Sequence, residues 1–246
     1  MKELVSIIIS VYNAEKRIEK ISDSVLNQSY SNIEVIIIDD CSGDNSFNII
    51  KNISKKDKRI KVYRNEINLG VSQTRNVGIE KAKGKYIAFL DSDDIWKKDK
   101  LEKQISYMDK NKIDICYTGY EMIDKDESHV SIYNVPKYID YEGLLKENVI
   151  CCSSVVIKSD LLKRNYFNHE FFHEDFVLWL RLLKLGYKAV GIQEALVSYR
   201  KGGRSSNKIK SSINRWAVYR KSEHLTLITS IYYFIFYTIN GIKKYY

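Results

Sequence analysis

The sequence predicts an α/β protein whose first half is a parallel sheet covered by helices. Four short apolar runs, rich in β-branched residues, are separated by stretches whose apolar residues recur at helical spacing. Continuous apolar runs of this length are typical of strands buried on both faces. Their alternation with helices predicts right-handed crossovers between parallel strands. The chain has 246 residues, 44% of them apolar, with one proline, which is enough for a large folded core.

The elements of the first half can be placed in order. We expect strands over residues 4–11, 33–38, 60–63 and 86–90, with a helix in each interval. Asn13 is the expected N-cap of the first helix. Gly84 is the expected C-cap of the third helix, which carries Arg75 and Asn76.

The second half has a different character. After a helix over 99–110, alternating and apolar segments at 113–123, 149–158 and 190–199 predict the strands of a smaller mixed sheet. Between the last two of these lies an amphipathic helix over 171–185, stopped by Gly186. We therefore expect one domain over residues 1–207, composed of halves 1–95 and 96–207, followed by a C-terminal region 208–246.

Carboxylates follow two of the predicted strands. Asp39 and Asp40 end the second strand, and the fourth runs into Asp91, Asp93 and Asp94. Ligands of open α/β sheets bind at the carboxyl ends of the strands, and paired carboxylates suit Mg²⁺ or Mn²⁺. An aspartate that only caps a following helix is the alternative. A calcium loop of the EF-hand type is excluded, because Ile95 and Trp96 stand where it needs Asp or Asn and then Gly. Nor does the chain contain a dinucleotide-binding or P-loop glycine motif.

The net charge of +9 arises in the residues from Arg200 onward. From Arg200 onward there are ten Lys or Arg and one acid, Glu223. This region also contains a 15-residue apolar run, 225–239, with five aromatic residues. The run is shorter than the roughly 20 residues that span a bilayer. A helix lying on an anionic membrane surface fits the basic and aromatic composition, and a helix packed on the domain is the alternative.

The cysteines indicate a reducing compartment. There are four, none in a C-x-x-C pair, and the apolar run that follows Lys2 is expected to be a strand and not a secretory signal. We therefore expect a cytoplasmic protein, associated peripherally with the inner face of the cell membrane.

Several motifs together resemble family-2 glycosyltransferases. They are Val5-Ser-Ile-Ile-Ile-Ser-Val-Tyr-Asn13, Ile38-Asp-Asp-Cys-Ser-Gly-Asp-Asn-Ser46, Arg75-Asn76, Phe89-Leu-Asp-Ser-Asp-Asp94 and Glu174-Asp175 before Leu178-Trp-Leu-Arg-Leu182. The likeness covers nearly the whole chain. The end of the chain is similar to the subgroup that builds teichuronic acids, capsules and O-antigens. The resemblance implies the A-type glycosyltransferase fold and an inverting, metal-dependent transfer of sugar from a nucleoside diphosphate, with UDP the expected nucleotide, to a lipid-linked saccharide.

The resemblance also implies roles for individual residues. The nucleotide-binding positions are Ser10, Tyr12, Asp40, Arg75 and Asp91, with Asp40 accepting a hydrogen bond from uracil. Asp93 is the implied ligand of Mn²⁺ or Mg²⁺, with Asp91 near it. Asp175 is the implied general base, with Glu174 beside it. The chain departs from the family pattern at Ser10, where Pro is usual, and at 201–207, a possible lid that lacks the His some members place on the metal.

Two other functions are open from the residues alone. His169-Glu170-Phe-Phe-His173 matches the H-E-x-x-H pattern of zinc metallopeptidases, with Glu194 downstream as a third ligand. The turn-like residues 165–168 argue against the helix that this pattern needs.

A non-enzymatic nucleic-acid binder is suggested by the net charge and 19 Tyr. We expect no nucleic-acid partner, because the basic residues gather in one tail and do not alternate with aromatic residues along a sheet.

Overall fold

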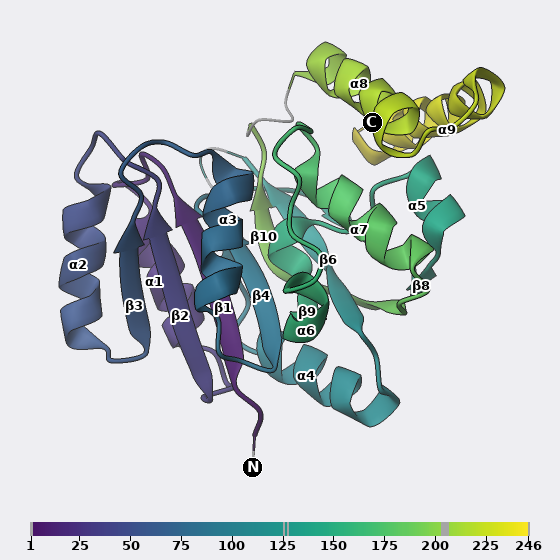
Figure 1. The fold of residues 1–246 in the computed structure, drawn as a ribbon. Coiled ribbons are helices and arrows are strands. Elements are labelled where there is room, and N and C mark those ends of the chain that lie inside the picture. The colour runs from purple at the N-terminus through teal and green to yellow at the C-terminus, as the bar shows by residue number, and fades with distance from the viewer. Residues whose placement is uncertain (1, 125, 127, 203–206, 246) are drawn as a thin grey trace.

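The computed structural model describes residues 2–124, 126, 128–202 and 207–245, and its first half is a parallel sheet (Figure 1). The strand order is β3-β2-β1-β4. These strands are Val5–Val11 (β1), Ile33–Asp39 (β2), Ile60–Arg64 (β3) and Tyr86–Asp91 (β4). Ser10 lies beside Asp91 of β4, and Val11 lies beside Asp39 of β2. The predicted acidic strand ends therefore meet at one edge of the sheet.

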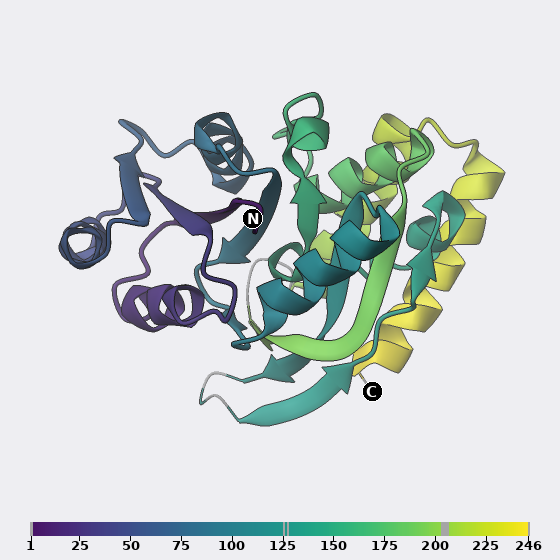
Figure 2. The ribbon, with the colours of Figure 1, turned by 90° about the horizontal axis from the view of Figure 1, so that it is seen from below.

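Helices cover both faces of this sheet, which explains the unbroken apolar runs. Alternate residues of β1 face opposite cores: Ile8 packs in the cluster that contains Ile79 of α3, and Ile7 and Ile9 pack in the one that contains Ile21 of α1. Figure 2 shows α1 and α3 on opposite sides of the strands. The helices of this half are Ile18–Leu26 (α1), Ser46–Lys56 (α2) and Val71–Lys81 (α3).

The strands of the second half continue the same sheet. Val156–Lys158 (β9) lies antiparallel between β4 and Ile115–Ile123 (β6), and Ala189–Arg200 (β10) pairs in parallel with β6. Short strands Ile95–Trp96 (β5), His129–Tyr133 (β7) and Tyr138–Ile139 (β8) complete the sheet. The helical segments here are Lys100–Asn111 (α4), Tyr141–Lys146 (α5), Cys152–Ser154 (η1), Ser159–Leu162 (α6) and Glu174–Lys184 (α7).

Three local predictions were wrong. The strand expected over 149–158 is reduced to β9, because residues 152–154 form a 3₁₀ turn. Asn13 does not cap α1, which begins at Ile18; its side-chain oxygen instead accepts a hydrogen bond from the Gly43 amide, 2.9 Å away. Gly84 is not a C-cap. A Cβ there would lie 2.6 Å from the Ser6 nitrogen, so this glycine permits close packing on β1.

The C-terminal region packs on the domain through one of its sides. It consists of Lys208–Ala217 (α8), the π-helical turn Val218–Ser222 (η3) and Leu227–Tyr245 (α9). Tyr219 and Tyr233 belong to the main core, whereas the opposite side of α9 exposes apolar residues: Leu227, Ile228, Ile231, Tyr232, Ile235, Ile239 and Ile242. Within the described chain, every helix is too short or too polar to cross a membrane.

Candidate active site

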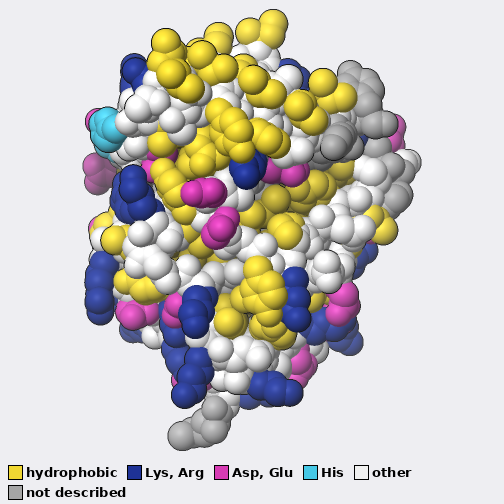
Figure 3. All heavy atoms as spheres, turned by 90° about the vertical axis from the view of Figure 1, so that its right-hand side faces the viewer, with side chains coloured by type: hydrophobic (Ala, Val, Ile, Leu, Met, Phe, Trp, Pro, Cys, Tyr) yellow, Lys and Arg dark blue, Asp and Glu magenta, His cyan; other side chains and the backbone are white. Residues whose placement is uncertain are grey.

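A cavity of about 1100 Å³ opens at the carboxyl edge of the sheet. Its walls come from both halves and from α8 and α9. All eight residues that the sequence assigned to the site line it: Ser10, Tyr12, Asp40, Arg75, Asp91, Asp93, Glu174 and Asp175. Figure 3 shows acidic side chains near the middle of one face of the molecule, below a broad area of hydrophobic side chains.

Arg75 connects acidic residues from the two halves of the domain. It projects from α3 and is 4% exposed. One guanidinium nitrogen donates to Asp91 at the end of β4 (2.5 Å) and another donates to Glu174 at the start of α7 (2.9 Å). The Phe167 ring supports the guanidinium, with 5.3 Å between the ring centroid and the central carbon. A planar guanidinium can hold two carboxylates in fixed directions, so Arg75 fixes the relative position of the two acidic clusters.

The turn after β4 holds its carboxylates in distinct environments. Asp94 is fully buried and accepts a hydrogen bond from the Arg200 amide of β10 (3.0 Å), while the Asp91 amide donates to the Ser153 hydroxyl (3.1 Å). The next element is strand β5, and α4 begins only at Lys100. These carboxylates therefore do not cap a helix, and that alternative was wrong.

Asp93 lies between these two fixed residues, half-buried in the cavity wall. Burial and the neighbouring Asp91 raise the pKa of Asp93 to about 6, although Arg17 and Arg200 act in the opposite direction. Clustered carboxylates with raised pKa values fit a site that a cation completes. In the described chain, no set of three or more His, Cys, Asp and Glu side chains forms a metal site. A divalent ion here would take the carboxylates of Asp91 and Asp93, and water and phosphate would fill its other positions, as is usual for Mg²⁺.

Asp40 anchors the loop that leads into α3. Its carboxylate oxygens accept hydrogen bonds from the Leu69 amide (2.8 Å), the Gly70 amide (2.9 Å) and the Asn65 side chain (2.8 Å). Asp40 is 3% exposed but still lines the cavity. Its binding to uracil stays a prediction. The structure shows a further role for this carboxylate, because its hydrogen bonds order residues 65–70.

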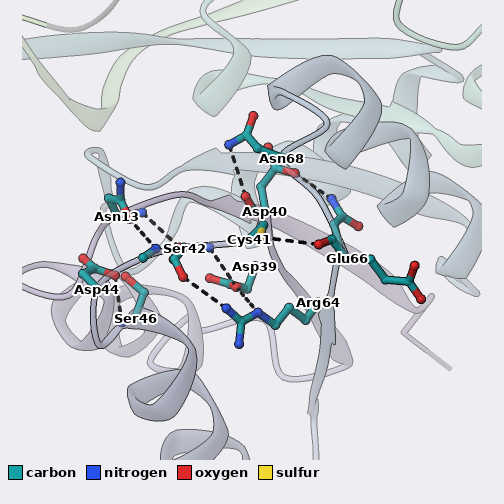
Figure 4. A network of polar contacts seen from close by, with 12 residues as sticks. Asn13, Asp39, Asp40, Cys41, Ser42, Asp44, Ser46, Arg64, Glu66 and Asn68 are labelled. Atoms are coloured by element: carbon teal, nitrogen blue, oxygen red, sulfur yellow. Dashed lines mark hydrogen bonds and ion pairs between the residues drawn. The ribbon is translucent and has the colours of Figure 1, made fainter.

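The loop after β2 is ordered by a network of polar contacts (Figure 4). Asp39 turns away from the cavity: one of its oxygens pairs with Arg64 (3.1 Å) and accepts from the Ser42 amide. The Ser42 hydroxyl accepts from the Asn13 amide (3.0 Å), which ties the end of β1 to this loop. The adjacent Tyr12 is 53% exposed at the cavity wall, and its binding to a nucleotide base stays a prediction.

Glu174 and Asp175 begin α7 but lie in different surroundings. Glu174 is 2% exposed and its carboxylate faces Arg75. Asp175 is half-buried, and one of its oxygens accepts from the Phe176 amide (2.7 Å). Burial and the adjacent Glu174 raise the pKa of Asp175 to about 6, with Arg75 opposing the shift. Asp175 therefore combines an accessible carboxylate with a pKa suited to proton transfer near neutral pH.

The zinc-peptidase alternative was wrong. His169 and His173 both precede α7, so they do not share a helical face. His169 is exposed, and the Nε2 atom of His173 is 3.1 Å from the Ser211 carbonyl oxygen. Glu194, the expected third ligand, pairs with Lys103.

The structure adds residues that the sequence analysis did not assign to the site. Ser153 holds Asp91, Phe167 supports Arg75, and Arg215 of α8 lines the cavity beside Asp175. Arg215 had been assigned only to the basic tail. Within the predicted lid at 201–207, Lys201 and Gly202 line the cavity, and residues 203–206 lie outside the described chain.

Comparison with known proteins identifies relatives along the whole chain. Residues 6–165 match the family model "Glycosyl transferase family 2". The chain is 39% identical to the Bacillus subtilis protein named as a teichuronic acid biosynthesis glycosyltransferase, TuaG, over 99% of this chain and 98% of that one. It is 42% identical to the Escherichia coli UDP-Glc:α-D-GlcNAc-diphosphoundecaprenol β-1,3-glucosyltransferase WfgD, over 98% and 94% of the two chains.

Solved structures share the fold at lower identity. S. aureus TarS 1–349 in complex with UDP-GlcNAc superposes with a TM-score of 0.72 at 21% identity, over 97% of this chain and 72% of that one. The mannosyltransferase PcManGT from Pyrobaculum calidifontis, in complex with GDP-Man and Mn²⁺, gives 0.70 at 16% identity, over 88% and 64%. These similarities confirm the predicted A-type glycosyltransferase fold.

The bridge through Arg75 can be tested by removing its charge. We expect Arg75→Met to lower the free energy of unfolding by about 3–5 kcal/mol, because it leaves the buried Glu174 carboxylate without its cation. Urea unfolding would measure the loss. The control is Arg59→Met, whose ion pair with Asp57 is partly exposed and should contribute about 0–1 kcal/mol. Equal losses in the two variants would contradict a special role for Arg75.

Proposed function

Because the chain belongs to glycosyltransferase family 2, we propose that it transfers a sugar, with inversion, from a UDP-sugar to a hydroxyl of a lipid-linked saccharide. The observation that carries this proposal is a single cavity in which Arg75 links the acids at 91–93 to those at 174–175. UDP-Glc and a diphosphoundecaprenol-linked sugar are named for WfgD, and UDP-GlcNAc is bound to TarS. The non-enzymatic alternative is wrong, because the family is one of transferases.

The donor would bind at the first half. The Tyr12 ring would stack on the base, and Asp40 would hold the loop that borders it and accept a hydrogen bond from uracil. Ser10 lies beside Asp91 on the adjacent strand, so both would face the ribose and diphosphate. Arg75 is committed to two carboxylates, so its main task here would be to hold Asp91 in position.

Asp93 and Asp91 would hold Mn²⁺ or Mg²⁺, which when bound neutralises the charge that develops on the departing diphosphate. Mn²⁺ accompanies GDP-Man in PcManGT. The raised pKa of Asp93 supports this assignment, since a cation would relieve the repulsion from Asp91.

Asp175 would accept the proton of the acceptor hydroxyl as that oxygen attacks the sugar carbon. The start of α7 fixes its position, and its raised pKa gives it more basicity than an exposed aspartate. Glu174 would act as a positioning residue, since its carboxylate is turned toward Arg75.

The C-terminal region would attach the enzyme to the inner face of the cell membrane. The outer side of α9 exposes seven apolar residues, and α8 adds Ile209 (76% exposed) and Ile213 (65% exposed). Exposed basic residues flank these apolar positions: Lys208, Lys210, Arg220 and Lys221. An apolar ridge bordered by cations suits the surface of an anionic bilayer.

The donor assignment predicts metal-dependent nucleotide binding. In calorimetric titrations with UDP, GDP and dTDP, we expect the wild type to bind UDP more tightly with Mn²⁺ than without it. Asp93→Ala should lose at least about tenfold of that affinity, because it removes a metal ligand. Asp160→Ala, at an exposed position of α6, is the control and should bind UDP normally. Unchanged Mn²⁺-dependent binding in Asp93→Ala would remove Asp93 from the metal site.

The general base predicts a pH profile. The base must be ionised, so kcat/KM should rise with pH, reach half its maximum near the pKa of Asp175, about 6, and then level off. Asp175→Asn should lower kcat by about 10²–10⁴-fold while the KM for the donor changes little. Asp160→Asn should keep both constants and the profile of the wild type. Persistence of transfer in Asp175→Asn would mean that another group takes the proton.

Membrane attachment predicts salt-sensitive binding to anionic vesicles. The double variant Ile231→Asn/Ile235→Asn should weaken binding by about tenfold or more, since it removes apolar area from the exposed ridge. Vesicle co-sedimentation at two ionic strengths would measure this. Ile132→Asn, at an exposed position of β7, is the control. Binding that neither salt nor the double variant affects would refute the attachment.

A further inference from the structure

Arg215 is a buried arginine with unused hydrogen-bonding capacity. It projects from α8 into the wall of the cavity and is 4% exposed. Its guanidinium stacks on the Phe176 ring, with 3.5 Å between the central carbon and the ring centroid, and lies 4.8 Å from that of Tyr237. Among the described residues, its Nε and Nη1 atoms have no hydrogen-bond partner. Arg215 also shares a hydrogen bond with the Tyr219 hydroxyl, which donates its own proton to the Leu145 carbonyl (2.6 Å), so Nε and Nη1 are the donors left for a ligand.

This arrangement is costly unless an anion binds. A guanidinium stays charged and offers five N–H donors, and burying such donors unpaired is unfavourable. Two aromatic rings lie against the guanidinium, and its Nε and Nη1 atoms remain for a ligand. Burial lowers the pKa of Arg215 from its ordinary value, which is the signature of a cation with too little compensation.

Other cations converge on the same side of the cavity. Lys201 and Lys208 also line it, and burial together with the charge of Lys201 lowers the pKa of Lys208. The single acid of the C-terminal region, Glu223, is engaged elsewhere, with Lys184 and Tyr141. The site is therefore suited to a ligand with several negative charges.

The position of Arg215 separates this ligand from the donor. Asp175, the proposed base, is among the charges that act on Arg215, whereas Arg17 and Arg200 act on Asp93. With the donor diphosphate placed at Asp91 and Asp93, as proposed above, Arg215 is left for the acceptor, whose hydroxyl must reach Asp175.

The same wall is partly apolar. Tyr237 and Ile242 of α9 line the cavity, and Ile235 and Ile239 of the same helix are exposed outside it. A ligand that carries a diphosphate and a hydrocarbon chain could thus place its charges at Arg215 and its chain along α9.

We propose that Arg215, assisted by Lys201 and Lys208, binds the diphosphate of the lipid-linked acceptor and so orients its sugar toward Asp175. This inference rests on the proposed function. It adds a binding site for the acceptor's charged linkage, separate from that for the nucleotide diphosphate.

Farnesyl diphosphate is a short probe for such a ligand, and UDP with Mn²⁺ probes the donor site. Calorimetric titrations would compare the wild type with Arg215→Gln and with the control Arg164→Gln, an exposed position outside the cavity. We expect Arg215→Gln to weaken farnesyl diphosphate binding at least about tenfold, the loss of a charge-assisted hydrogen bond, while UDP binding is unchanged. Farnesol, which lacks the diphosphate, should bind both proteins equally weakly, and inorganic pyrophosphate should bind less tightly than farnesyl diphosphate.

Three outcomes would overturn the proposal: unchanged farnesyl diphosphate binding in Arg215→Gln, an equal loss of UDP binding, or no binding of farnesyl diphosphate to a wild type that binds UDP. Failure of the wild type to bind UDP under any condition would instead count against the proposed function. If Arg215→Gln does not fold, as judged by thermal unfolding, Lys208→Gln at the rim of the cavity replaces it. A weaker affinity of that variant for farnesyl diphosphate alone supports the site, and unchanged affinity refutes it.

Discussion

The geometry of this active site depends on one buried cation. Arg75 lies between Asp91, which ends a strand of the first half, and Glu174, which begins a helix of the second half. Without it, carboxylates from two parts of the chain would repel one another across a poorly solvated space. Arg75 attracts both carboxylates and fixes their relative position, so an ion pair that stabilises the fold also sets the distance between Asp91 and the start of α7.

Other parts of the site are fixed by hydrogen bonds that involve backbone amides. The Arg200 amide holds Asp94, the Ser153 hydroxyl holds the Asp91 backbone, and the amides at 69–70 hold Asp40. Backbone groups are already ordered by the sheet and helices that carry them, so little conformational entropy is lost in making these contacts. The result is a preorganised first half, with the carboxylates placed before any ligand arrives.

Much of the fold was predictable, because parallel strands buried on both faces leave an unambiguous apolar run. The acidic site was predictable for a related reason: parallel strands end at one edge of the sheet, so Asp40 and Asp91 had to lie at the same edge. Contacts between distant segments were not predictable. Asn13 stands where a helix N-cap is expected, yet its side-chain oxygen accepts a hydrogen bond from the amide of Gly43, 30 residues away. Gly84 resembles a helix terminator and serves close packing, and Arg215 was one basic residue among ten, since only the fold buries it.

Helix α9 has one buried side and one exposed side. Tyr233 belongs to the core, whereas Ile228 and Ile235 are exposed to solvent. Because α9 is part of the core, it cannot move independently of the rest of the domain. If its outer side rests on a bilayer, as proposed above, the catalytic cavity would be held at one height and one tilt above the lipid headgroups. An acceptor hydroxyl would then be reached only if it stood at that height. The enzyme could thereby select acceptors by the number of sugars between the lipid and the reacting hydroxyl, without contacting each residue of the glycan.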